Sequence, residues 1–333
     1  MEYQEQSMLQ KNHRKVFSVM GFACFAILFI STALHFAAFY AARRFAPQWT
    51  SQSWFIWVAA FIPLYAAGVP VGVALFKRIP ADDSVIRKLR FKDLLIFLVM
   101  CFPIMYIGNI IGTALNAALH ALLGTEIKNP LELLMNGASV WLAVLVMVIL
   151  APVIEEFVFR KLIIDRVRSF GESHCVLVSG LLFGLFHGNL SQFFYAFGLG
   201  TLFAFIYVKT GRLRYTVFLH AAINLYSGII APLLYKGLDL NALTHGGEVN
   251  PDAVIRWMAE RLPNLIAIFF YSLVNLALVI IGLVLLIVRR RAFYFEHGSQ
   301  QPVKGTGFRT LFHNTGMIFF AAAALALFVF SLL

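Results

Sequence analysis

The sequence predicts an all-α, polytopic bundle of about eight or nine transmembrane helices. Of the 333 residues, 60% are hydrophobic and only 13% are charged, and the mean hydropathy is +0.81. Apolar runs longer than about 18 residues recur along the chain, and a helix of that length is sufficient to cross a bilayer. This composition is typical of an integral membrane protein that crosses the bilayer several times.

Nine apolar segments are candidate spans. The fifth and sixth are short for a helix that needs about 20 residues to cross the hydrocarbon core, so we expect them to be tilted or joined within the membrane. The third is long enough to extend beyond the bilayer, and the ninth is expected to be an appended helix. In chain order the candidates are residues 16–42, 54–76, 94–123, 139–165, 174–188, 192–208, 214–234, 264–288 and 311–333.

The cationic residues are distributed unevenly between the segments that join these spans. With a cytoplasmic N-terminus and alternating spans, the inner segments carry 21 of the 27 Lys and Arg residues. This positive-inside pattern predicts that the N-terminus is cytoplasmic and the C-terminus outside. The net charge of +11 is then explained by a basic surface facing anionic lipid, and no nucleic-acid groove is predicted. The inner segments are residues 1–15, 77–92, 160–173, 209–214 and 289–310.

The chain is expected to have three parts. Residues 1–138 form N-terminal transmembrane helices, residues 139–234 carry the motifs described below, and residues 235–333 contain an outer loop and the C-terminal transmembrane helices. The outer loop, residues 235–262, has mixed charge and either caps a site or simply connects two spans. The first span is predicted to be a retained anchor, because its apolar stretch is longer than the 7–15 residues or so of a signal-peptide core.

Two adjacent acids and an arginine follow an apolar run at membrane depth, where ionisable groups are costly and usually functional. Pro152 removes one backbone donor, so we expect a kink just before the acids. Glu156 precedes Arg160 by four residues, the favourable order for an intrahelical ion pair. Glu155 points about 100° away on the helix and is free to face another helix. The alternative is that both glutamates are interfacial and solvated.

Two further pairs of residues follow at i,i+4 spacing, Phe183 with His187 and His220 with Asn224, so each pair shares one helix face. We counted about 1.5 Å per residue from the expected helix ends. This places Glu155, His187, His220 and Asn224 about 10–20 Å from the cytoplasmic face. The depths are compatible with one shared site. For each histidine alone, a hydrogen-bonded structural role is the alternative.

This set suits hydrolysis by an activated water molecule. A carboxylate such as Glu155 with an imidazole such as His187 beside it can remove a proton from water and return it to a leaving amine. His220 and Asn224 can donate hydrogen bonds to an oxyanion. Zinc is the main rival, because Glu155, His187 and His220 are the ligand types of a catalytic zinc site. A transporter, a proton relay or a non-catalytic immunity protein that binds a toxin also stays open.

The motifs resemble those of the CPBP family, the CAAX proteases and bacteriocin-processing enzymes also called Abi proteins, which are intramembrane glutamic endopeptidases. The resemblance covers about residues 139–230 and rests on three motifs in order: EExxxR (residues 155–160), FxxxH (residues 183–187) and HxxxN (residues 220–224).

The resemblance implies roles for each of these residues. Glu155 and His187 would activate the water, and His220 and Asn224 would stabilise the oxyanion. Supporting roles would fall to three further residues: Glu156, Arg160 and Phe183. It also implies a multi-pass protein of a prokaryotic plasma membrane, with no cofactor and no metal. The expected partners are the lipid bilayer and a membrane-associated protein or peptide substrate. Prenylated CAAX proteins and bacteriocin-type peptides are candidates, but the resemblance does not carry over the substrate.

Overall fold

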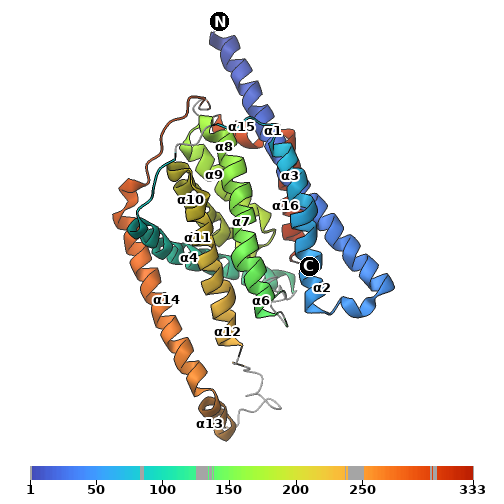
Figure 1. The fold of residues 1–333 in the computed structure, drawn as a ribbon, viewed down its shortest axis with the longest axis vertical. Helices are drawn as coiled ribbons and strands as arrows, with labels where there is room; N and C mark the ends of the chain where they lie inside the picture. Colours follow the sequence, from blue (N-terminus) through green and yellow to red (C-terminus); the bar gives the residue numbers. More distant parts are fainter. Residues whose placement is uncertain are drawn as a thin grey trace.

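The computed structural model describes residues 2–82, 86–124, 139–236, 251–300 and 306–332, with Leu134, Gly137, Leu238 and Pro302, apart from the side chains of residues 2–11 and 251–253. All regular secondary structure within this part of the chain is helical (Figure 1). The predicted all-α class is therefore confirmed.

The helices are numbered in chain order, and η marks segments of 3₁₀ or π geometry. They are α1 (Glu2–Phe45), η1 (Pro47–Trp49), α2 (Ser53–Ile62), η2 (Pro63–Gly68), α3 (Val69–Phe76), α4 (Phe91–Leu123), α6 (Val140–Ala143), η3 (Val144–Leu150), α7 (Ala151–Glu156), η4 (Phe157–Leu162), α8 (Ile163–Val167), η5 (Arg168–Phe170), α9 (Glu172–Phe186), α10 (Leu190–Thr210), α11 (Leu213–Ile223), η6 (Asn224–Ile230), α12 (Ala231–Tyr235), α13 (Pro251–Glu260), α14 (Leu262–Val288), η8 (Arg290–Ala292), α15 (Gly307–Phe312) and α16 (Thr315–Phe330).

Every predicted span coincides with an apolar helix of the structure. Within the described residues, 7 helices are long and apolar enough to cross a membrane, and the shorter α9 and α16 account for the remaining two predicted spans. The sixth span, α10, is longer than predicted, at 21 residues. The first helix also differs, because α1 begins at Glu2, whereas the sequence predicted an apolar helix only from residue 16.

Three prolines alter the geometry of the spans that contain them. Pro70, Pro152 and Pro232 each lie two residues after a π-helical segment, namely η2, η3 and η6. Proline has no N–H, and its ring crowds the carbonyl four residues earlier, whereas the wider turn of a π-helix accommodates both effects. A π-helical segment, η3, thus precedes the acid pair. The kink expected there stays a prediction.

The long helix α4 crosses the bundle obliquely and packs closely on α10 (Figure 1). A Cβ atom on Gly108 would lie 2.4 Å from the backbone nitrogen of Tyr195, and one on Gly112 would lie 2.5 Å from the carbonyl oxygen of Leu190. Only glycine permits this approach of the two backbones. With 33 residues, α4 is about 50 Å long, which exceeds a hydrocarbon core of about 30 Å and agrees with the expected long third span.

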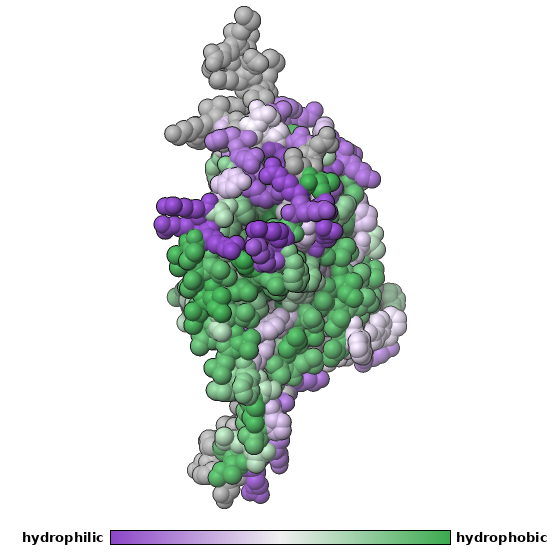
Figure 2. All heavy atoms as spheres, turned by 60° about the vertical axis from the view of Figure 1, so that its left-hand side comes forward, coloured by the Kyte–Doolittle hydropathy of each residue, from purple (hydrophilic) through white to green (hydrophobic). Residues whose placement is uncertain are grey.

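Four of the five basic segments lie at one end of the bundle, where backbone hydrogen bonds join them. Asp82 N–H donates to the Asp165 carbonyl, Arg87 N–H to Thr210, and Glu172 N–H to Glu296. Figure 2 shows hydrophilic residues gathered at one end, next to a wide hydrophobic belt. The segments therefore share one side of the belt, as alternating spans require. That this side faces the cytoplasm stays a prediction.

Two expectations are not tested by the described residues. Part of the predicted outer loop, residues 235–262, lies outside them, since residues 237 and 239–250 are not described. The division of the chain at residues 138 and 234 stays a prediction. Helices from both flanking parts pack against the central segment, with α4 on α10 and α16 on α9.

Candidate active site

The centre of the candidate site is a fully buried ion pair between Glu156 and Arg160, as predicted from their spacing. Arg160 Nε donates to Glu156 Oε2 at 2.9 Å, and Nη2 donates to Oε1 at 3.2 Å. Both side chains are 0% exposed. A guanidinium that binds both oxygens of a carboxylate fixes the orientation of both groups. Glu156 is therefore an ionised carboxylate held in one position.

Neighbouring helices complete the surroundings of Arg160. Its Nη1 donates to Ser179 Oγ at 2.8 Å, and Ser179 Oγ in turn donates to the Phe159 carbonyl at 2.7 Å. The guanidinium carbon lies 4.9 Å from the centre of the Phe183 ring and 5.9 Å from that of Phe203. Hydrogen bonds and cation–π contacts thus tie the acid-bearing span to α9 and α10.

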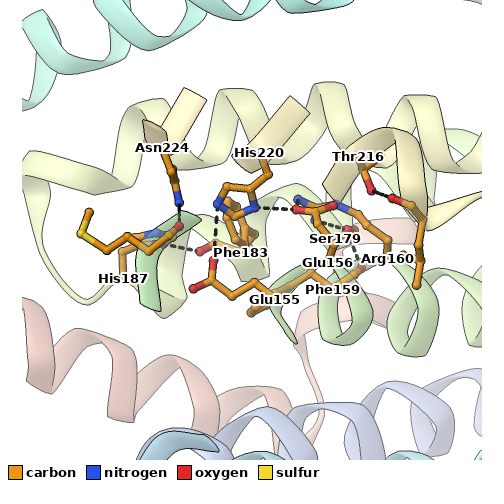
Figure 3. Close-up of polar contacts among 12 residues, drawn as sticks. Glu155, Glu156, Phe159, Arg160, Ser179, Phe183, His187, Thr216, His220 and Asn224 are labelled. Atoms are coloured by element: carbon orange, nitrogen blue, oxygen red, sulfur yellow. Dashed lines mark hydrogen bonds and ion pairs between the residues drawn. The ribbon is translucent and has the colours of Figure 1, made fainter. Parts of the chain in front are cut away.

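His220 on α11 connects this ion pair to the second acid (Figure 3). Its Nδ1 lies 3.0 Å from Glu156 Oε1, and its Nε2 lies 3.8 Å from Glu155 Oε2. Because Glu156 is ionised and can only accept, the proton of the first contact is on Nδ1. Glu156 therefore fixes the orientation of the imidazole and directs Nε2 towards Glu155.

Glu155 is placed differently from its neighbour. Its side chain is 25% exposed, whereas that of Glu156 is 0% exposed. Among the described residues, the Glu155 carboxylate makes an ion-pair contact at 3.8 Å with Nε2 of His220, and it accepts no hydrogen bond. Two adjacent acids thus have different surroundings, and Glu155 is available to bind a proton or a water molecule.

His187, the last residue of the FxxxH motif, has a defined tautomer. Its Nδ1 lies 2.9 Å from the carbonyl oxygen of Phe183, one helical turn earlier. A carbonyl only accepts hydrogen bonds, so Nδ1 carries the proton and the neutral ring presents the lone pair of Nε2. The ring of Phe183 lies 5.0 Å from that of His187 and 5.7 Å from that of His220. Phe183 therefore separates the two imidazoles and packs against both.

Asn224 joins two spans by binding a backbone carbonyl that has no donor within its own helix. Its Nδ2 donates to the carbonyl of Met147 at 2.8 Å. In η3 the hydrogen bonds run from residue i+5 to residue i, and Ala151 N–H binds the carbonyl of Val146. In the same register the Met147 carbonyl would need the N–H of residue 152, which is proline and has none. Asn224 supplies the missing donor, and its second amide hydrogen is not used in this bond.

Two cavities meet at the free acid. Their volumes are about 380 Å³ and about 370 Å³, and Glu155, Phe183 and His187 line both. The first cavity lies between α1, η2, η4 and α16 and is mainly apolar. The second also contains His220 and Asn224. The structure therefore brings all four predicted catalytic residues to the second cavity, and the first adjoins it on the side away from His220.

A three-ligand metal site is not formed in this part of the structure. Among the described residues, no group of three His, Cys, Asp or Glu side chains is arranged to hold a metal ion. In the zinc alternative, the ligands would be Glu155, His187 and His220. Of their ring nitrogens, Nδ1 of His187 is bonded to Phe183 and Nδ1 of His220 to Glu156.

Sequence reasoning missed several residues that shape the site. Ser179 lies one turn before Phe183, and this spacing could have identified it as a partner on the same face of α9. Tyr65 lines the first cavity and Tyr195 the second, but no motif connects either residue to the acids.

The central segment matches a known family. Residues 137–226 match the family described as "Type II CAAX prenyl endopeptidase Rce1-like". This segment of the chain is therefore similar to that family of CAAX prenyl endopeptidases. The match covers nearly the same residues as the predicted resemblance, and the EExxxR, FxxxH and HxxxN motifs all lie within it.

A curated relative supports the same family. The chain is 30% identical over 105 residues to a Bacillus subtilis (strain 168) protein named "Putative membrane peptidase YdiL". The aligned region is 31% of this chain and 43% of the relative, so the chain covers less than half of the relative's length. No solved structure matches the chain.

The buried ion pair yields a prediction about stability. Replacing Glu156→Gln leaves the Arg160 charge buried without a counter-ion, so the free energy of unfolding should fall by about 3–5 kcal/mol. Thermal unfolding in detergent micelles measures the effect. The matched control is Glu260→Gln, because that side chain is 71% exposed, is paired with Arg261 and should change stability by at most about 1 kcal/mol. Equal melting of the two variants would contradict the role of the ion pair.

Proposed function

We propose that the protein is a membrane-embedded endopeptidase of the glutamic type, which hydrolyses peptide bonds of membrane-associated proteins or peptides. The observation that carries the proposal is the difference between the two acids. Glu156 is locked by Arg160 and His220, whereas Glu155 is free at the junction of two cavities. The match of residues 137–226 to the Rce1-like family and the peptidase name of the Bacillus subtilis relative support the same function.

Glu155 is the general base in this proposal. A water molecule between Glu155 and Nε2 of His187 attacks the carbonyl carbon of the scissile peptide bond, and its proton passes to the Glu155 carboxylate. A tetrahedral oxyanion forms. The carbon–nitrogen bond then breaks, and Glu155 returns the proton to the leaving amine. The products are a carboxylic acid and an amine, so one water molecule is consumed and Glu155 is regenerated.

In this proposal, His220 and Asn224 stabilise the oxyanion. They lie one helical turn apart and line the same cavity. Asn224 uses one amide hydrogen for the Met147 carbonyl and has the second available for the oxyanion. His220 donates Nδ1–H to Glu156, so Nε2 donates only when the ring is doubly protonated. In that state Glu156 is the counter-ion of the ring.

The first cavity favours substrates held in the membrane. Apolar side chains of α1, η2 and α16 form much of its lining, and it adjoins the acid directly. Such a cavity suits an apolar anchor or an apolar segment of a substrate. A prenylated CAAX protein and a bacteriocin-type peptide are the candidate substrates, and the experiment below includes tethers that separate them. The basic end of the bundle is assigned to the cytoplasm by the positive-inside rule, with the N-terminus on the same side.

Glu155→Gln tests the proposed base. The amide cannot accept the proton of the water, so kcat should fall by about 10²–10⁴. The purified protein in vesicles would be assayed on fluorogenic peptides anchored by a farnesylated cysteine or by a single transmembrane helix. The melting temperature should be unchanged, because Glu155 makes no hydrogen bond that the variant would lose.

The matched control for this experiment is Glu260→Gln, which makes the same chemical change on an exposed helix. It should hydrolyse the peptides at the wild-type rate. Near-normal turnover by Glu155→Gln would show that another group is the base. A wild-type protein that cleaves no anchored peptide but binds one would favour the non-catalytic alternative.

Asn224→Ala separates an oxyanion role from a purely structural one. Loss of one oxyanion donor should lower kcat by about 10²–10³ with little change in KM. The variant also loses its bond to Met147, so it should melt at a lower temperature. The control is Asn275→Ala, because Asn275 is a buried amide that binds the Tyr271 carbonyl away from both cavities. It should be destabilised with normal kcat, and the same result for Asn224→Ala would refute the oxyanion role.

A further inference from the structure

Four polar side chains lie on one face of the C-terminal half of α4, which is otherwise mainly apolar. They follow one another at spacings of four, three and four residues, the repeat of a single helix face. This set is termed the polar face of α4, and it lies outside the segment that matches the family. Its members are Asn109, Thr113, Asn116 and His120.

Hydrogen bonds connect the polar face to the second cavity at two points. Thr113 Oγ1 donates to Asn109 Oδ1 at 3.5 Å, and Asn109 lines the cavity. Asn116 Nδ2 donates to Ser191 Oγ at 2.7 Å, and Ser191, on α10, lines the cavity as well. The polar face of α4 is therefore continuous with the cavity that contains Glu155.

Part of the polar face is exposed, although it lies far from both ends of the helix. Asn109 and Thr113 are exposed, and Asn109 is about 27 Å from the first residue of α4 at about 1.5 Å per residue. An amide or a hydroxyl against lipid tails lacks hydrogen-bond partners and is costly there. Hydrogen bonding between helices accounts for Asn116. It does not account for Asn109 and Thr113, which bond to each other on one helix.

The proposed reaction consumes one water molecule for each bond cleaved, so water must reach Glu155 within the membrane. The first cavity is mainly apolar and is poorly suited to conduct water. We infer that the polar face of α4 lines a hydrated path that supplies water to the second cavity, and through it to Glu155. The use of this water in hydrolysis rests on the proposed function, whereas the hydration of the path can be tested without it.

Cysteine accessibility measures the hydration of the path. Asn109→Cys and Thr113→Cys would be made singly in a variant whose native cysteines, Cys24, Cys101 and Cys175, are replaced by alanine. A charged, water-soluble methanethiosulfonate would be added to the protein in vesicles, and the labelling rate followed by mass spectrometry. Both positions should react readily, because a hydrated thiol can form the thiolate that attacks the reagent.

The matched controls are Ile110→Cys and Ile111→Cys, on the same helix. Both positions are exposed, but they point about 100° and 200° away from Asn109 and so lie outside the polar face. They should react about tenfold more slowly or less, because lipid excludes the charged reagent and a thiol in hydrocarbon stays protonated. Equal rates for Asn109→Cys and Ile110→Cys would overturn the inference. Every variant should label fully after unfolding in detergent.

Hydrolysis of the anchored peptides shows whether the path serves the site. Modified Asn109→Cys carries a bulky charged group beside the second cavity, so its kcat should fall about tenfold or more below that of the unmodified variant. Ile110→Cys treated in the same way should lose no activity. Fully labelled Asn109→Cys with undiminished kcat would overturn the inference and leave the proposed function intact. A wild-type protein that cleaves no anchored peptide would refute the proposed function, whereas the labelling rates test the hydration of the polar face alone.

Discussion

The candidate site depends on the buried ion pair between Glu156 and Arg160. Two charges taken out of water are tolerated only when each is paired and hydrogen-bonded, and here the guanidinium binds both oxygens of the carboxylate. The locked carboxylate then orients His220, and Arg160 connects the span to Ser179 and Phe183. Arg160 is thus a structural counter-ion, whose effect is to leave the adjacent acid, Glu155, as the free carboxylate.

Irregular helix geometry is the second constraint on the site. Pro152 is followed within one turn by the acid pair, and the π-helical segment before it leaves the Met147 carbonyl without a donor from its own helix. An unpaired carbonyl is expensive in a membrane, so a side chain from another span must satisfy it, and Asn224 does so. The same asparagine is therefore a link between spans and a candidate oxyanion donor.

Local features of this protein were predictable, whereas contacts between spans were not. The length of an apolar run is a property of the sequence itself, so each of the nine predicted segments coincides with an apolar helix, and seven of these helices are long enough to cross a membrane. The Glu156–Arg160 pair was found because its spacing lies within one helix. The contact of His220 with Glu156, and that of Asn224 with Met147, depend on how α11 and η6 pack against another span. Tyr65 was missed for the same reason, since it lines the cavity beside the acid from a different span.

The central claim is that a carboxylate and an imidazole activate water at Glu155 without a metal ion. The most direct test is to treat the purified wild-type protein with strong chelators and measure both its metal content and its hydrolysis of anchored peptides on the same sample. The account predicts undiminished turnover with much less than one zinc ion per chain. Loss of activity on chelation, with recovery when Zn²⁺ is added, would contradict it and favour the zinc site.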